Sequence, residues 1–222
     1  MYKTDQTIKR LVKHLYSTLI LLLLFSCGNE KVLQLPELDH SEVTEILDVS
    51  PAYLFYDETK ADSSELNRKN LIGSTNWLVN VDKRLTLEQS IPKIIFLQNK
   101  KRDAQMHKNE NAKNYFTCHD KSINNLGFIE FTDIYYHEEK LEDYLRTQNI
   151  TEYHVLSFNI DSITLNNRSV ILEELQQFDS SEVKVFLKFD KQLSFQNYIS
   201  YKEQLLKLNS TQINIVNDEF IY

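Results

Sequence analysis

Three adjacent residues, Cys118, His119 and Asp120, carry the side chains that most resemble a catalytic or metal-binding group. A thiolate, an imidazole and a carboxylate are all zinc ligands, and a thiol beside an imidazole suits a nucleophile and its base. Residues 115–118 are predicted to form a strand, and neighbouring strand residues point to opposite faces of a sheet. We therefore predict that Cys118 is a small buried residue of that strand and not a nucleophile or ligand.

His107, His137 and Glu138 are the remaining candidates for a metal site or a catalytic site. The chain contains neither a His-Glu-x-x-His motif nor a paired Cys-x-x-Cys motif, so no metal site is expected. It has only three glycines and no glycine-rich phosphate-binding loop, so neither a cofactor nor a nucleotide is expected.

Carboxylates that follow predicted strands are a further candidate group, made up of Asp82, Asp120 and Asp190. A glycosidase needs two carboxylates held about 5–10 Å apart in a cleft. An Asp directly after a strand more often hydrogen-bonds the backbone of a turn. We favour the turn for all three aspartates.

Aromatic residues could form a platform that binds carbohydrate or peptide. At alternating strand positions such residues more often build the core of the protein. We favour the core for the five residues concerned, which are Tyr53, Tyr56, Trp77, Tyr135 and Tyr136.

The N-terminus has the pattern of a secretion signal. Residues 1–14 carry four bases and one acid, and residues 15–25 are almost entirely apolar. An apolar run of about 11 residues is too short to span a bilayer, which needs about 20. The following Leu24-Phe25-Ser26-Cys27 resembles the bacterial lipobox, although Phe25 is bulkier than the usual residue at its position.

The lipobox resemblance implies that residues 1–26 are removed and that Cys27 becomes the lipid anchor. Two or three acyl chains would then hold the protein firmly on a membrane. Gly28 stands where an Asp would retain such a protein on the inner membrane in enterobacteria, so the outer membrane is favoured. Ordinary secretion with a chance Cys, or a short uncleaved anchor, is the alternative.

The mature chain would be acidic. Loss of the four bases and one acid of the signal changes the net charge from −7 to −10. This charge argues against nucleic acid and against broad adhesion to anionic lipid. Cys118 would be the only free thiol, which leaves no internal disulfide.

Alternation of strands and helices predicts an α+β fold. We expect a lipidated polar tether over residues 27–51 with a short helix at 41–47, a first half over 52–150 and a second half over 151–222. The expected strands cover 52–56, 76–81, 115–118, 128–136, 153–165, 183–189 and 213–216. The expected helices cover 87–101 (with Pro92 in the first turn), 138–148, 170–178 and 195–208, and a loop or short helix is expected at 57–70.

The two halves echo each other at an offset of 70. Residues 116–123 align with 186–193, each reading as a strand, an Asp-Lys turn and an apolar residue, and 128–131 align with a helix face at 198–201. Residues 77–82 can similarly be set against 156–161. A chance match is the alternative, because Asp-Lys after a strand is common.

The second half resembles the periplasmic domain of the ExbD/TolR family. The resembling residues run from Val155 to Val216 and include Leu165-Asn166-Asn167, Leu172-Glu173-Glu174-Leu175 and Val183 to Lys191. The resemblance implies two small strand-helix-strand-helix halves that bind partners in an energy-transducing or transport complex. Its proton-coupling helix has no counterpart here, because the apolar segment is the signal and Asp5 lies outside it.

The sequence thus favours a non-catalytic protein-interaction module in the cell envelope, with an envelope protein as its partner. The competing hypothesis is a lipid-anchored hydrolase with a site near His119 and His137. That hypothesis requires both imidazoles and a carboxylate to converge within about 4–6 Å.

Overall fold

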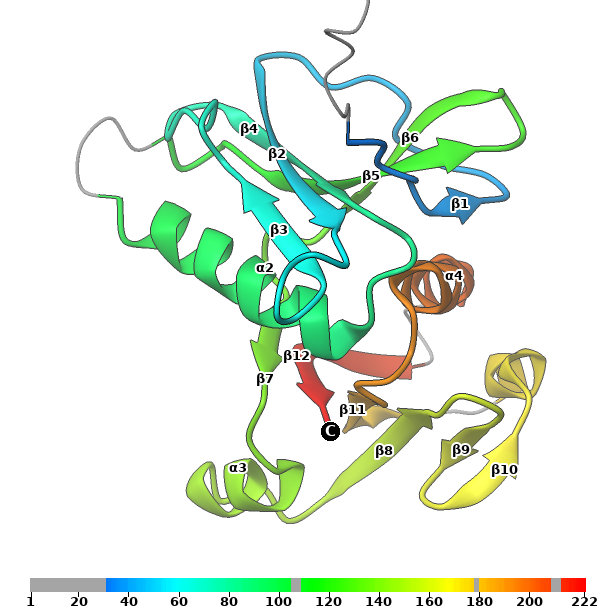
Figure 1. Cartoon of the computed structure of the whole chain (residues 1–222). Helices are drawn as coiled ribbons and strands as arrows, with labels where there is room; N and C mark the ends of the chain where they lie inside the picture. The colour runs from blue at the N-terminus through cyan, green and yellow to red at the C-terminus, as the bar shows by residue number, and fades with distance from the viewer. Residues whose placement is uncertain (1–30, 105–108, 178–179, 209–212) are drawn as a thin grey trace, which may run out of the picture. The chain divides into compact units, whose positions relative to one another are not determined.

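The computed structural model describes residues 31–104, 109–177, 180–208 and 213–222 (Figure 1). The chain divides into two compact units, Met1–Val32 and Leu33–Tyr222. The second unit is a mixed α+β fold with two sheets of six strands each and, among its described residues, three α-helices. This confirms the predicted fold class.

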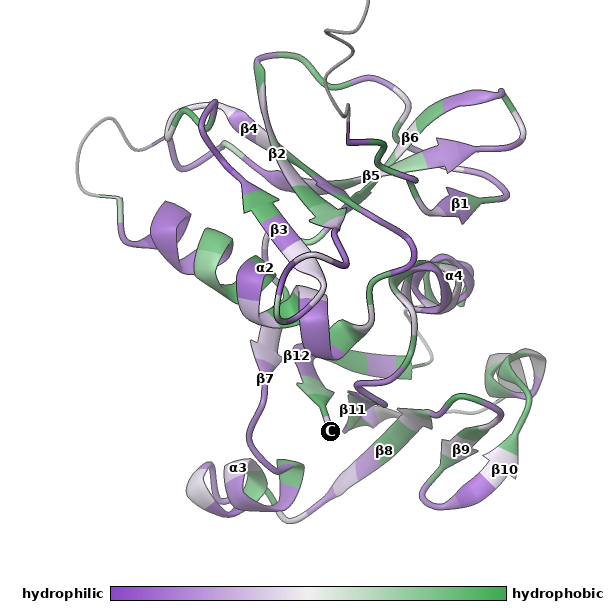
Figure 2. Cartoon of the chain, viewed as in Figure 1, coloured by the Kyte–Doolittle hydropathy of each residue, from purple (hydrophilic) through white to green (hydrophobic). Residues whose placement is uncertain are grey.

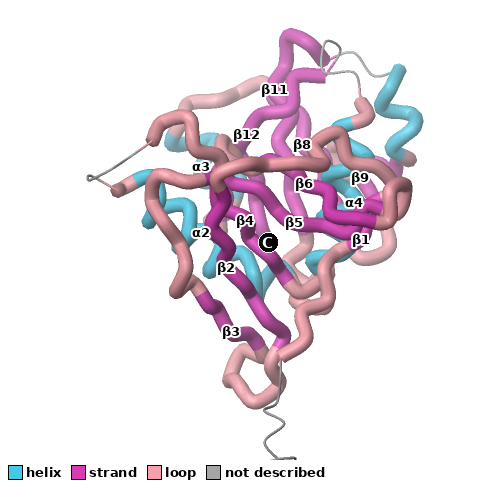
Figure 3. The backbone as a smooth tube through the Cα atoms, turned by 90° about the horizontal axis from the view of Figure 1, so that it is seen from above, coloured by secondary structure: helices cyan, strands magenta, loops and turns pink. Residues whose placement is uncertain are grey.

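Figure 3 shows β2, β4 and β5 side by side in the first sheet, and these central strands are parallel. Its path is β3-β2-β4-β5, where β2, β4 and β5 are parallel, and β3 and β6 pair antiparallel with β2 and β5. Pairing of β4 with β5 ends at Val79 and Phe116, and β1 then pairs in parallel with the end of β5. The bounds are β1 (Glu37–Leu38), β2 (Val49–Tyr56), β3 (Ser64–Asn67), β4 (Asn76–Val81), β5 (Asn114–Asp120) and β6 (Asn125–Glu130).

The second sheet has the order β10-β9-β8-β11-β12-β7. Strands β8, β11, β12 and β7 are parallel, and β9 and β10 extend the sheet as antiparallel strands. The bounds are β7 (Tyr135–His137), β8 (Tyr153–Phe158), β9 (Ile163–Leu165), β10 (Arg168–Val170), β11 (Ser180–Phe189) and β12 (Ile213–Ile221).

One hydrophobic core joins both sheets to helices α2 (Leu87–Arg102) and α4 (Phe195–Leu206). Figure 1 shows these two helices between the sheets, and in Figure 2 hydrophobic residues recur along α2 between hydrophilic ones. Both helices bury three residues at matching positions, which are Leu87, Ile91 and Leu97 in α2, and Phe195, Ile199 and Leu205 in α4. This spacing is that of one helix face.

A smaller cluster covers the other face of the second sheet. Helix α3 (Leu141–Thr147) packs Leu141 and Leu145 against Phe186 and Phe220. The neighbours of Phe186 in β11 belong to the main core, because successive strand residues point to opposite faces. The second sheet is therefore covered by helices on both faces.

Two loops of similar sequence join the halves. Residues 82–87 read Asp-Lys-Arg-Leu-Thr-Leu and residues 190–195 read Asp-Lys-Gln-Leu-Ser-Phe, and each leads from a central strand into a helix. Thr86 and Ser194 form an antiparallel bridge. The N–H of Leu87 donates to Leu193 O at 2.9 Å, and the N–H of Phe195 donates to Leu85 O at 2.6 Å.

The two loops supply hydrogen-bond acceptors to the backbone N–H groups at both helix starts, because the first N–H groups of a helix have no partner within it. Glu88 N donates to Lys191 O at 2.9 Å, and Gln196 N donates to Lys83 O at 3.2 Å. The next N–H in each helix donates to the capping hydroxyl, at 3.3 Å for Thr86 and 3.1 Å for Ser194. Each helix is thus started by its own cap and by the loop of the other half.

Several predicted elements are corrected by the structure. Residues 41–47 form no helix, because the Ser41 hydroxyl bonds Val43 O and Phe128 O instead of capping one. Residues 64–67 form β3, and the expected helix at 170–178 is replaced by β10 and a 3₁₀ helix (Leu172–Gln177). Pro92 lies inside α2 beyond its first turn, because Thr86 and Gln89 set the helix start with a capping box.

The echo at an offset of 70 is wrong. After Asp120-Lys121 the chain makes a hairpin into β6, whereas after Asp190-Lys191 it enters α4. The apolar residues 128–131 therefore continue a sheet and not a helix face. The second alignment, of 77–82 with 156–161, also fails because β4 leads to a helix and β8 leads to a hairpin.

Two boundaries differ from the expected ones. Residues 33–51, expected to be part of a tether, belong to the second unit and contribute β1 and the start of β2. The chain passes from the first sheet to the second between β6 and β7, because β7 pairs with β12. The expected boundary was residue 150.

Thr86→Cys combined with Ser194→Cys should form a disulfide spontaneously. The bridging pair lies between its flanking hydrogen bonds, a geometry that brings Cα atoms to about 4.5 Å, within disulfide range. We expect nearly complete oxidation in air, measured by non-reducing electrophoresis and thiol titration of the full chain. The control, Thr86→Cys with Ser200→Cys, should stay reduced, and a fully reduced Thr86/Ser194 pair would contradict the arrangement of the two halves.

Candidate functional site

The Cys-His-Asp group lies at the end of β5 and does not form a site. Cys118 is fully buried, and burial raises the pKa of its thiol strongly, so it stays protonated. The ring of His119 lies 3.2 Å from the side-chain oxygen of Asn124. Because Cys118 and its neighbours alternate in direction along β5, the thiol and the imidazole do not share a partner.

His137 lies in the second sheet, on β7. Its Nε2 is 2.7 Å from Asp218 on the neighbouring strand, and its ring stacks on Phe220 with centroids 4.8 Å apart. His119 and His137 therefore belong to different sheets and have different partners, so the structure does not bring them together as the hydrolase hypothesis requires. Within the ranges given above, no three His, Cys, Asp or Glu side chains are grouped as metal ligands would be. His107 and Cys27 lie outside the described residues.

The three aspartates after strands bind their own turns, which confirms the prediction. Asp82 accepts from the N–H of Arg84 at 3.1 Å, Asp120 from that of Ser122 at 2.8 Å, and Asp190 from that of Gln192 at 2.8 Å.

Two of the five aromatic residues are in the interior. Trp77 is buried and its indole N–H donates to Ile72 O at 2.7 Å, and buried Tyr136 bonds the Tyr198 hydroxyl at 2.9 Å. Tyr135 is exposed under the guanidinium of Arg102. The core prediction is therefore confirmed for Trp77 and Tyr136 and wrong for Tyr135, and Tyr53 and Tyr56 are half-buried on β2, so the five residues do not form one platform.

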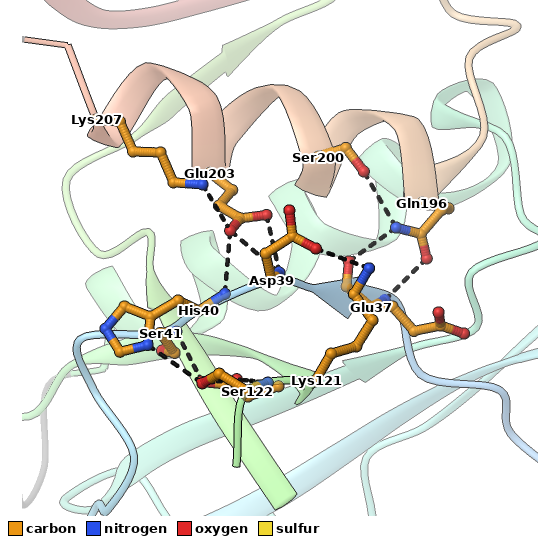
Figure 4. A network of polar contacts seen from close by, with 11 residues as sticks. Glu37, Asp39, His40, Ser41, Lys121, Ser122, Gln196, Ser200, Glu203 and Lys207 are labelled. Atoms are coloured by element: carbon orange, nitrogen blue, oxygen red, sulfur yellow. Dashed lines mark hydrogen bonds and ion pairs between the residues drawn. The ribbon is translucent and has the colours of Figure 1, made fainter. Parts of the chain in front are cut away.

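A network of polar contacts instead surrounds residues 34–41, which we call the N-terminal strand (Figure 4). Its main chain is bound by groups from distant parts of the chain. Backbone bonds come from the first sheet, where Lys83 N donates to Gln34 O at 2.7 Å, His119 N to Pro36 O at 2.8 Å and Lys121 N to Leu38 O at 3.0 Å. The side chain of Leu38 is buried in the core.

Helix α4 binds the same strand from the other side. The Gln196 amide is bidentate, accepting from Glu37 N and donating to Glu37 O, both at 2.8 Å. The Glu203 carboxylate accepts from Asp39 N and His40 N, each at 3.1 Å, and Figure 4 shows it between these groups and Lys207. Glu203 is buried, and its charge is stabilised by these donors and by Lys207 at 3.1 Å.

Two aspartates bind the two ends of the strand. Asp82 accepts from Gln34 N at 3.2 Å, and Asp120 accepts from Ser41 N at 2.7 Å. We call Asp82, Lys83, Asp120, Lys121, Gln196 and Glu203 the strand-binding site. The side chains of its four residues other than the lysines contact main-chain groups, so these hydrogen bonds do not depend on the sequence bound.

Charge adds selectivity for two side chains. Lys83 pairs with Glu37 at 2.6 Å, and Lys121 pairs with Asp39 at 2.7 Å. Leu38 between these acids is the buried residue, so the segment held there has the order acid, aliphatic, acid. The lysine contacts, by hydrogen bond and charge, lower the pKa of Glu37 and of Asp39.

The binding aspartates are also held ionised. The Ser122 hydroxyl and then the N–H groups of Ser41 and Ser122 lower the pKa of Asp120, although burial opposes this. Burial is the largest single influence on Asp82 and acts to raise its pKa, but the hydrogen bonds from Arg84 and Gln34 together outweigh it and lower the pKa.

Sequence reasoning missed this site because Gln196 and Glu203 lie about 160 residues from the strand that they bind. One signal was available. Glu203 falls four residues after Ile199 and eight after Phe195, on the apolar face of the predicted helix, where a carboxylate needs a partner.

Glu203→Ala should weaken the fold by about 1–3 kcal/mol, because charged hydrogen bonds to two N–H groups are lost. Urea denaturation of the full chain measures this loss. Glu45→Ala, at an exposed position close by in sequence, serves as control and should change stability by less than about 0.5 kcal/mol. Equal stability of the two variants would show that the carboxylate does not hold the strand.

Acid should release the N-terminal strand. Asp82, Asp120, Glu37 and Asp39 all have lowered pKa values in the folded state, so their contribution is complete above the ordinary carboxyl pKa of about 4. It is lost as pH falls through the lowered values. NMR signals of the Glu37 and Asp39 amides should stay constant from pH 7 to about pH 4 and move only below it. A transition of these signals with its midpoint above about pH 5 would contradict the lowered pKa values.

No protein-family model, no curated protein and no solved structure matches this chain. Over the part of the chain that the structure describes, no helix is long and apolar enough to cross a membrane. The lipobox and ExbD/TolR resemblances therefore stay predictions that rest on the residues quoted for them.

Proposed function

We propose that this chain is a bacterial envelope lipoprotein, anchored through Cys27 and favouring the outer membrane, whose folded unit is a non-catalytic module that binds another envelope protein. The anchor is supported by the order of a basic segment, a short apolar run and Cys27. These residues lie outside the described ranges, so their support comes from the sequence alone.

The proposed anchor would hold the folded unit close to the bilayer. Six residue steps lead from Cys27 to Leu33, where the second unit begins. A fully extended chain covers at most about 3.6 Å per residue, so these steps reach about 20 Å. Binding would therefore take place near the membrane surface, while the net charge of the mature chain opposes contact with anionic lipid.

One observation carries the binding role. The first sheet and α4 together hold an extended segment by its main chain, which is the mode in which many modules bind partner strands. The candidates for catalysis are, in contrast, already engaged. Cys118 is buried, Asp120 binds its own turn, and His137 pairs with Asp218. No contact in the described residues favours the hydrolase with His119 and His137.

We further propose that the two sheets are copies of one ExbD/TolR-like domain, in which residues 82–87 and α2 align with residues 190–195 and α4 at an offset of 108 residues. The order β2-β3, β4, α2, β5 matches the order β8-β9, β11, α4, β12. Equivalent hydrogen bonds support the match of elements, because Asp82 N donates to Leu54 O and Asp190 N to Phe158 O, both at 2.9 Å. By this resemblance the partner belongs to an energy-transducing or transport complex, without the proton-coupling step.

Crosslinking in intact membranes tests the proposed function. The full chain, with its own signal, should begin at an acylated Cys27 by mass spectrometry and should be crosslinked to a defined envelope protein. Cys27→Ser, the matched control, should lose both the lipid and the crosslink. An unmodified Cys27 still joined to Ser26 would overturn the anchor, and turnover of a substrate without any envelope partner would overturn the binding role.

A further inference from the structure

The first sheet has a gap that the second sheet lacks. In the second sheet, β11 and β12 remain paired up to Phe189 and Ile221. In the first sheet, β4 leaves β5 after Val79 and Phe116, and the last part of that edge of β5 is paired only with β1. Without the N-terminal strand, the end of β5 would present an unpaired edge, to which an extended peptide adds readily.

The N-terminal strand is bound as a separate peptide would be. Its regular part is two residues long, and it is followed by the exposed residues Thr44, Glu45 and Leu47 before β2 begins. Its contacts are main-chain hydrogen bonds, two exposed or half-exposed ion pairs and the buried side chains of Pro36 and Leu38. Two side-chain contacts at its C-terminal end add to these, from the His40 ring to the Ser122 hydroxyl at 3.3 Å and from the Ser41 hydroxyl to Phe128 O at 3.0 Å. A pocket of about 270 Å³, lined in part by Leu38, His40 and Phe128, adjoins it, so the strand leaves space unfilled.

We propose that the strand-binding site is a peptide-binding site, and that residues 34–41 occupy it as an internal, releasable ligand. The partner segment is an extended peptide with one aliphatic residue between two acids. Lys83 and Lys121 would pair with the two acids, and the aliphatic residue would take the buried position of Leu38. This inference rests on the proposed function as an interaction module and names the chemistry of its partner.

Covalent attachment makes the internal strand a strong competitor. A segment joined by a short linker has an effective concentration on the order of millimolar, so a free peptide binds little to the intact chain. Cutting the linker removes this advantage. A recognition site for a sequence-specific protease can replace residues 44–47, of which Thr44, Glu45 and Leu47 are exposed. The cut chain then holds residues 34–41 by the contacts described and by the bridge between Val43 and Phe128.

The experiment uses a labelled synthetic peptide of residues 33–42 and the full chain in detergent, cut or uncut. Fluorescence anisotropy should show binding to the cut chain, and about a hundredfold weaker binding to the uncut chain, as the linker argument predicts. A peptide carrying Leu38→Asp should bind at least about tenfold more weakly, because it places a charge in an apolar site.

Charge reversal gives a matched control. A peptide with Glu37→Lys and Asp39→Lys should fail on the cut chain, and should bind again when that chain carries Lys83→Glu and Lys121→Glu. Restoration by the double reversal would show that the ion pairs select the ligand, whereas a general loss of packing would not be restored.

Three results would overturn the inference. In the first, the cut chain keeps its own fragment through gel filtration with excess peptide. In the second, it loses the fragment but binds no peptide. In the third, its folded circular dichroism spectrum disappears once the fragment leaves. Any of these, together with an envelope partner found by crosslinking, would remove the peptide site and leave the interaction module. Peptide exchange without an envelope partner would support the site and remove the proposed function.

Discussion

The described unit depends on a reciprocal contact between two helix starts. Helix N-terminal N–H groups lack partners within their own helix, and in this fold the loops preceding α2 and α4 supply them to each other. Leu87 and Phe195, the first residues of these helices, are also fully buried. The contact therefore combines satisfied donors with packed side chains, and it fixes α4 against the first sheet.

This placement of α4 creates the strand-binding site. Gln196 and Glu203 come from the second half, whereas Asp82, Asp120 and the edge of β5 come from the first, so neither half holds the N-terminal strand alone. The halves are otherwise alike in topology. They differ because pairing of β4 with β5 ends at Val79, whereas pairing of β11 with β12 continues to Phe189. The proposed binding surface therefore lies where the two halves differ.

The sequence predicted the elements with strong local signals. The strands at 76–81 and 183–189 and the helices at 87–101 and 195–208 have clear periodicity, capping residues or both, and the structure contains all of them. It could not predict β1, whose two residues have no strand pattern and pair only with a strand 80 residues away. Ser41 looked like a helix cap because the same hydroxyl chemistry serves a turn. The proposed match of residues 82–87 with 190–195 was missed because Asp120-Lys121 has the same turn residues as Asp190-Lys191, but is not followed by a helix.

Native-state hydrogen exchange tests the account most directly. The account predicts that the amides of Leu87 and Phe195 exchange only through global unfolding, with the same free energy, whereas those of Glu37 and Asp39 exchange through a smaller opening of lower free energy. Exchange of Glu37 and Asp39 only at the global free energy of unfolding would contradict it, because the N-terminal strand would then be an inseparable part of the core.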